Sequence, residues 1–113
     1  MSEYTSLEVS KRLAEAGFKA EHEKNWYLNF PYKGDNGLYD VSYNPNIKQA
    51  PAYRSDTLLA WLLSHGDSIE IAPDLDGFNC TFWKGHDDYN GISIFLPDAL
   101  AELVLKVMEV SHV

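Results

Sequence analysis

The central segment of the chain constrains the fold most, because it is the most apolar stretch and carries its own helix start and stop signals. It runs from Ala52 to Ile71. Ser55 stands at an N-cap position, Asp56 places a negative charge in the first turn, and Gly66 occupies a position where a left-handed residue ends a helix. Leucine, alanine and tryptophan dominate the positions between, so almost no polar face remains. We therefore expect a central helix that is covered on several sides and is the most buried helix of the protein.

Length and composition indicate one globular domain spanning residues 1–113. The chain is 45% hydrophobic and 13% aromatic, which is too apolar for a disordered segment and sufficient for a packed core. No apolar run reaches the roughly 18 residues of a membrane span, and the N-terminus lacks the features of a signal peptide. We expect a cytoplasmic protein that does not enter a membrane. A single cysteine, Cys80, excludes an internal disulfide and a cysteine-based zinc cluster.

The net charge of −8 is concentrated in the second half of the chain. Residues 1–56 hold eight acidic and seven basic residues, a net of −1. Residues 57–113 hold nine acidic residues against the two bases Lys84 and Lys106, a net of −7. Phosphate backbones are bound by clustered Lys and Arg, so this field argues against nucleic acid as a partner.

The N-terminal segment is expected to form a helix over residues 4–18. Thr5 and Glu8 match a capping box, in which each side chain satisfies a backbone N–H of the first turn. Gly17 followed by Phe18 fits a Schellman ending. The apolar positions of this segment form a single stripe, so the helix is expected to lie with one side against the rest of the protein.

An aromatic hairpin is expected to follow. Residues 25–30 are rich in extended and aromatic types and end at a proline, and residues 38–43 alternate between two faces. The pair Asn36-Gly37 between them is a turn signal. Residues 44–51, bracketed by two prolines, are expected to be an irregular loop leading into the central helix.

The C-terminal half predicts three strands and a helix. The strands are expected at residues 68–72, 78–83 and 92–96. The Asp-Gly and Asn-Gly pairs that end at Gly77 and Gly91 indicate hairpin turns. Alternation places Ile92 and Ile94 on the inner face of the last strand. Pro97 then opens the last helix at its first position.

Together these segments predict an α+β domain with the order α-β-β-α-β-β-β-α. Three helices are expected to cover one face of an antiparallel sheet of four to five strands. No internal repeat or linker divides the chain.

Cys80 and His86 are the first candidates for chemistry, as a nucleophile and its base. Cys80 alternates in register with two phenylalanines on the expected core face, and a buried cysteine without a neighbouring base is inert. We interpret it as a core residue. Asp74 and Asp76 resemble the start of a calcium loop, but glycine and glutamate are absent from the positions that an EF-hand requires, so a hairpin turn is the simpler interpretation.

His86, Asp87 and Asp88 form the densest polar cluster of the sequence. Such a triplet could hold a divalent cation, but the other histidines show no ligand spacing relative to it. We interpret the cluster as a solvated loop and assign no metal site.

The N-terminal half is rich in tyrosine and tryptophan. Half of the aromatic side chains of each strand must face away from the helices, which leaves an aromatic sheet face. Two interpretations stay open: a binding surface for a protein or ligand, because Tyr and Trp are enriched at interfaces, or cross-strand packing that stabilises a thin sheet. For a small ligand, Trp26, Tyr39 and Tyr53 would be stacking platforms and Arg54 the partner of an anion.

The chain resembles a group of small proteins encoded by bacteriophages and prophages. The resemblance is carried by Thr5-Ser-Leu-Glu-Val-Ser-Lys-Arg-Leu-Ala-Glu-Ala-Gly-Phe18, Trp26-Tyr27, Tyr53 with Leu58-Leu59-Ala-Trp61-Leu62, and Ala99-Leu-Ala-Glu102. In that group a capped helix of this type precedes an aromatic strand and a leucine-rich helix. The resemblance implies a phage setting inside a bacterial host cell, where many small acidic proteins act by binding a host factor.

The sequence thus predicts a non-enzymatic, acidic phage-type protein, monomeric or homodimeric, that contacts a host or defence protein without a cofactor. The alternative is a small-ligand or nucleotide-binding module that uses its aromatic surface. A hydrolase built on His86 and its neighbouring acids ranks third. The candidate binding residues are Trp26, Tyr39, Tyr53, Arg54, Asp74, Asp76, His86, Asp87 and Asp88.

Overall fold

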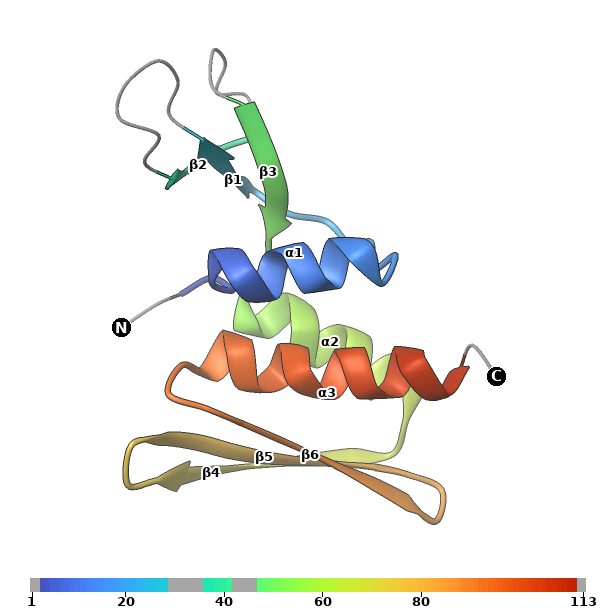
Figure 1. Ribbon diagram of the computed structural model, residues 1–113. Helices are drawn as coiled ribbons and strands as arrows, with labels where there is room; N and C mark the ends of the chain where they lie inside the picture. Colours follow the sequence, from blue (N-terminus) through green and yellow to red (C-terminus); the bar gives the residue numbers. More distant parts are fainter. Residues whose placement is uncertain (1–2, 29–35, 42–46, 112–113) are drawn as a thin grey trace.

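A computed structural model describes residues 3–28, 36–41 and 47–111. It is an α+β structure in which a layer of three helices lies between two three-stranded antiparallel sheets (Figure 1). The elements are α1 (Leu7–Glu15), β1 (Lys24–Leu28), β2 (Asn36–Asp40), β3 (Ile47–Ala52), α2 (Ser55–His65), β4 (Ser68–Asp74), β5 (Gly77–Lys84), β6 (Asp87–Ser93) and α3 (Leu96–Ser111).

The α+β class and the three helices are confirmed, but the prediction of one sheet with four to five strands is wrong. The first sheet has the order β2-β1-β3 and the second β4-β5-β6. The observed order is therefore α-β-β-β-α-β-β-β-α, with one more strand than expected. The helices stand between the two sets of strands and keep their edges apart (Figure 1).

The additional strand is β3, which occupies most of the predicted loop at residues 44–51. It pairs antiparallel with β1 at the edge of the first sheet, with Asn25 opposite Pro51. An edge strand tolerates proline, because the missing N–H can face away from the ladder. The two prolines concealed the strand from sequence reasoning, and residues 44–46 lie outside the described ranges.

The most buried helix is α3, not the central helix α2. Its apolar stripe is fully buried at Leu100, Leu103 and Val104. Among the described side chains of α2, only Leu58 and Leu62 are buried, and Leu63 is 48% exposed. The reason is placement: α3 packs against β5, β6, α1 and α2, whereas α2 is held mainly by α3.

Strand β6 begins five residues earlier than predicted, at Asp87 instead of residue 92, ends at Ser93 instead of residue 96, and has the opposite phase to the prediction. Ile92 and Ile94 are 59% and 61% exposed, whereas Gly91 and the half-buried Tyr89 face α3. A Cβ atom at Gly91 would lie 2.4 Å from the Ala99 carbonyl oxygen, so only glycine lets α3 approach this strand. Because side chains alternate along a strand, the contact at Gly91 turns Ile92 outward, and Ile94 follows the end of β6.

Glycine also acts differently from the prediction at Gly66 and in two of the expected turns. Gly66 has an extended φ of −160°, and a Cβ atom there would lie 2.2 Å from the Phe82 ring, so packing requires glycine at the end of α2. Gly37 and Gly91 lie within strands. The turns of the second sheet are Leu75-Asp76 and Gly85-His86.

The start of α1 is fixed by a hydrogen-bond cluster around Thr5. The N-cap is Ser6, whose hydroxyl accepts from the Val9 N–H at 3.3 Å, whereas Thr5 is buried. Thr5 N–H donates to the Tyr53 carbonyl at 2.9 Å, and its hydroxyl accepts from Tyr53 N–H at 3.1 Å. The Thr5 carbonyl accepts from the indole N–H of Trp26 at 2.9 Å. This cluster joins α1, β1 and the junction of β3 with α2.

The predicted Schellman ending of α1 is confirmed. Gly17 has a φ of 87° and donates its N–H to the Ala14 carbonyl at 3.1 Å, and Phe18 N–H donates to the Leu13 carbonyl at 3.0 Å. These two bonds satisfy carbonyls that the helix leaves without partners. The ending turns the chain so that residues 19–23 lead from α1 to β1.

Candidate functional site

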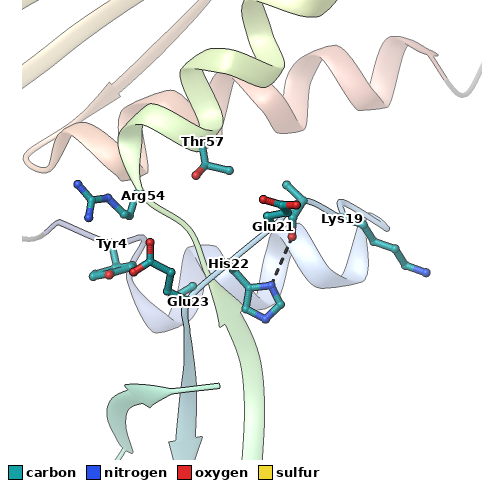
Figure 2. A pocket seen from close by; sticks show the side chains of 9 residues that line it. Tyr4, Lys19, Glu21, His22, Glu23, Arg54 and Thr57 are labelled. Carbon is teal, nitrogen blue, oxygen red and sulfur yellow. Dashed lines mark hydrogen bonds between the residues drawn. The ribbon is translucent and has the colours of Figure 1, made fainter. Parts of the chain in front are cut away.

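One hollow of the described structure is a groove between the 19–23 segment and the start of α2 (Figure 2). Its volume is about 710 Å³. An isolated antiparallel bridge between Tyr4 and Arg54 closes one side of it. The lining residues are Tyr4, Lys19, Ala20, Glu21, His22, Glu23, Ala52, Arg54 and Thr57.

The groove is of mixed charge, with two cationic side chains and two carboxylates among its lining residues. Arg54 pairs with Asp56 at 3.4 Å, and this carboxylate is the main cause that raises the Arg54 pKa above its usual value. The His22 imidazole bonds the Ala20 carbonyl through Nδ1 at 3.3 Å (dashed line in Figure 2). Lys19 extends away from the other lining side chains in the same view. The groove therefore does not present charge of a single sign.

The three predicted stacking residues do not form a common platform. Tyr53 is 2% exposed and packs edge-on against Phe18 with ring centroids 4.8 Å apart. Burial raises the pKa of its phenol. Trp26 is half-buried, and its indole N–H donates to the Thr5 carbonyl. Tyr39 lies opposite Asn25 in the ladder, so it points to the other face of the sheet from Trp26.

The expected aromatic sheet face is not present among the described residues. The described tyrosines, tryptophan and phenylalanine of the N-terminal half are buried or half-buried. Asn25 and Tyr27 are both 4% exposed, and the Asn25 amide donates to the Tyr27 hydroxyl at 3.1 Å. The aromatic side chains thus serve cross-strand and helix packing, one of the two interpretations that the sequence leaves open. Phe30, Tyr32 and Tyr43 lie outside the described ranges.

The acidic turns lie at opposite ends of the second sheet. Asp74 and Asp76 flank the β4–β5 turn, whereas His86, Asp87 and Asp88 follow at the β5–β6 turn. Strand β5, eight residues long, separates them by about 25 Å at roughly 3.3 Å per residue. Asp87 lies opposite Lys84 and Asp88 opposite Trp83, so their side chains point to opposite faces. Within the described ranges, no group of three or more His, Cys, Asp or Glu residues is arranged to hold a metal ion.

Cys80 lies in the core, as the alternation predicts. It is fully buried on the inner face of β5, where burial raises the pKa of its thiol to about 11. The thiol is therefore protonated at neutral pH and is a poor nucleophile. His86 lies in the turn at the end of β5, away from it.

Within the part of the chain that the structure describes, one face of the second sheet has no helix on it. All three helices lie on the side of Cys80 and Phe82, and the opposite face of β4-β5-β6 is free of them (Figure 1). Alternation places Glu70, Thr81 and Asn90 across the middle of this outer face. The amide of Asn90 donates to the Asn79 side chain at 2.5 Å and to the Thr81 hydroxyl at 3.4 Å.

An apolar patch lies at the β4–β5 end of this sheet. We call it the hairpin patch and define it as Leu75, Ile92 and Ile94, bordered by Asp74 and Asp76. Leu75 is 98% exposed, and the two isoleucines are 59% and 61% exposed. They surround a depression of about 420 Å³. Hairpin turns ordinarily carry glycine, asparagine, aspartate or serine, so a fully exposed leucine contributes nothing to the turn itself.

The hairpin patch is built by a close approach of two backbone segments. At the start of β5, a Cβ atom on Gly77 would lie 2.5 Å from the Cα atom of Ile94. The glycine therefore allows the β4–β5 turn to lie beside the chain that leaves β6. Asp74 stabilises the turn because its carboxylate accepts the Leu75 N–H at 2.8 Å.

Sequence reasoning identified the two aspartates of this patch and missed its apolar members. Alternation predicts an inner face for Ile92 and Ile94, and the turn signal that ends at Gly77 does not single out Leu75. The available signal was the composition of Pro73-Asp-Leu-Asp-Gly77, in which one large aliphatic residue stands between two acids.

Comparison with known proteins gives no match: no family model fits the chain, and no curated protein or solved structure is significantly similar to it. Among the described residues, no helix is long and apolar enough to span a membrane. The two candidate sites of the described structure are therefore the groove and the hairpin patch.

Proposed function

We propose that this chain is a non-enzymatic protein that acts by protein–protein contact through the hairpin patch. The observation that carries the proposal is the exposure of Leu75, Ile92 and Ile94 in one place, with 98%, 59% and 61% of their surfaces accessible. Clustered exposed aliphatic groups rimmed by polar residues mark interaction sites in soluble proteins.

The energetics favour a contact of this kind. Fully burying a leucine or isoleucine side chain contributes about 1.5–3 kcal/mol, so three such anchors supply much of the driving force for association. Interfaces combine an apolar centre with a polar rim, and Asp74 and Asp76 supply a rim here.

The biological setting that we propose is a phage or prophage protein in the cytoplasm of a bacterial cell, directed against a host or defence factor. It is supported by the resemblance of α1, β1 and the leucine-rich part of α2 to small phage-encoded proteins. The acidic second half, with a net charge of −7 over residues 57–113, supports a protein partner rather than nucleic acid.

A pull-down from bacterial lysate, read by mass spectrometry, tests the proposal. The native protein is compared with a Leu75→Ser, Ile92→Thr double variant and with Val110→Thr, a control at an aliphatic residue of α3 that is 54% exposed. We expect a partner that the native and control proteins capture and the double variant loses. A partner retained by the double variant would contradict the assignment of the site.

A Lys-substituted variant extends the same experiment to the other turn. Asp87→Lys with Asp88→Lys reverses charge at the β5–β6 end of the sheet, about 25 Å from the patch. If contact is centred on the hairpin patch, this variant keeps most of its partner. Loss of the partner would instead place the contact at the β5–β6 turn.

The second candidate function is binding of a small ligand in the groove beside Arg54. Its support is the size of the groove, about 710 Å³, which lies within the range of ligand sites. The mixed charge favours a ligand that carries both signs, such as an amino acid or a nucleotide with a basic group. A thermal-shift screen tests this function: a ligand that raises Tm in native protein, and not in Arg54→Gln, would support it.

A further inference from the structure

We infer that the occupant of the hairpin patch is a basic, apolar peptide segment of another protein. This inference rests on the proposed function and names the chemistry of the partner. It is carried by the combination of aliphatic anchors with a border of carboxylates, in a half of the chain that holds nine acidic residues and two bases.

The exposed charged residues at the border of the patch are acidic. Asp74 and Asp76 are exposed at the turn itself, and Glu70 is exposed on the same outer face of the sheet. Residues 57–113 contain only two bases to oppose nine acids. One of those bases, Lys106, donates to the Asn90 carbonyl, and the other, Lys84, lies at the far end of β5.

The charge of the patch argues against another copy of this chain as the occupant. A symmetric dimer through this surface places the same patch of one copy against that of the other. Asp74 and Asp76 of both copies would then meet, and each chain already carries a net charge of −8. Juxtaposed like charges oppose association, so self-contact here is disfavoured.

The depression within the patch determines the form of the ligand. The depression of about 420 Å³ lies between the β4–β5 turn and the chain after β6, so an aliphatic or aromatic side chain can enter it. Lysine or arginine residues next to that anchor would reach the two aspartates at its border. Exposed ion pairs of this kind are weak and screened by salt, so the apolar anchors hold the segment and the charges select it.

The test uses two synthetic amphipathic peptides of equal length, one of leucine and lysine and the other of leucine and glutamine. Binding to the full chain is followed by fluorescence anisotropy of the labelled peptide. We expect the lysine peptide to bind at least tenfold more tightly, and we expect 0.5 M salt to reduce that preference severalfold. Equal binding of both peptides would overturn the inference.

Three double variants identify where the peptide binds on the protein. Asp74→Asn with Asp76→Asn should weaken the lysine peptide about tenfold, and the asparagine side chain introduced at position 74 keeps an oxygen that can accept the Leu75 N–H. Asp87→Asn with Asp88→Asn is the matched charge control at the other turn and should leave binding unchanged. Leu75→Ser with Ile92→Thr should abolish binding without unfolding the protein, because both side chains are exposed.

The outcomes separate the inference from the proposed function. If the two Asp-to-Asn pairs weaken the lysine peptide equally, attraction is unspecific and the inference fails, whereas the pull-down still decides whether a protein partner uses the patch. If sedimentation shows a dimer that Ile92→Thr dissociates, the occupant is a second copy and the inference fails. A partner without a basic segment would overturn the inference and leave the proposed function intact.

Discussion

The backbone N–H of Ser6, the N-cap of α1, donates a 2.8 Å hydrogen bond to the Asp98 carboxylate in the first turn of α3. The two residues are 92 positions apart, and Asp98 is only 7% exposed. This bond joins the starts of two helices that lie side by side in the central layer, so the N-terminal segment is held by the C-terminal helix.

Replacement of Asp98 is predicted to destabilise the protein. Asp98→Ala leaves the Ser6 N–H without an acceptor in a largely buried place, which costs about 1–3 kcal/mol. Asp98→Asn keeps an acceptor oxygen at the same position and should cost less. Urea unfolding measures both, and equal stability of Asp98→Ala and native protein would show that the bond does not contribute.

Thr5→Val is predicted to lower stability by about 1–3 kcal/mol, because it keeps the shape of threonine and removes the acceptor of the Tyr53 N–H. It also removes the 2.6 Å hydrogen bond between the hydroxyls of Thr5 and Ser10. Thr5→Ser retains the hydroxyl and is the matched control. Thermal unfolding should rank the proteins native, then Thr5→Ser, then Thr5→Val; a Val variant as stable as the Ser variant would refute the role of the hydroxyl.

Gly91→Ala is predicted to separate α3 from β6. Its methyl group would lie 2.4 Å from the Ala99 carbonyl oxygen, and overpacking of this kind costs about 1–3 kcal/mol or more. The neighbouring Ile92→Ala changes an exposed side chain and should alter stability by less than about 0.5 kcal/mol. Guanidinium unfolding of the two variants gives the comparison. Similar midpoints would mean that the helix does not pack closely at this position.

Cys80 is predicted to make stability depend on alkaline pH. The folded protein holds the thiol proton more tightly, with a pKa of about 11 against an ordinary value of 9.0. Because the folded-state pKa is raised, this contribution is complete below pH 9 and is lost as pH rises toward 11. Cys80→Ala should show a smaller decline across that range in urea unfolding. An identical decline in both proteins would assign it to other groups.

The ending of α1 at Gly17 was predictable from the sequence, whereas the N-cap at Ser6, the extended conformation of Gly66 and the packing between distant elements were not. The Schellman ending at Gly17 depends only on residues within the same turn, so a few consecutive letters of sequence define it. The phase of β6 depends instead on the approach of α3 to Gly91, and a short alternating run cannot reveal which of its faces a helix will cover. Strand β3 was not predicted for the same reason, because Pro51 indicated a loop and the pairing of this segment with β1 is a contact between residues distant in sequence.

The residues of the candidate site were likewise predictable from the sequence only in part. Asp74 and Asp76 were identifiable because turn chemistry is local. Tyr53 was expected at a surface but is buried, since its ring packs against Phe18. The exposure of Ile92 could not be predicted, because it follows from the phase of its strand. A binding surface that combines a turn with the outer face of a strand therefore became visible only in the folded chain.

The most direct test of the hairpin patch as the contact surface is a chemical-shift map of the ¹⁵N-labelled protein titrated with the leucine–lysine peptide. We predict that the largest amide shifts fall on residues 74–78 and 92–94, which line the depression, and that they disappear in the Leu75→Ser, Ile92→Thr variant. Shifts confined to residues 19–23 and 54–57 would place binding in the groove and contradict the assignment of the hairpin patch as the contact surface.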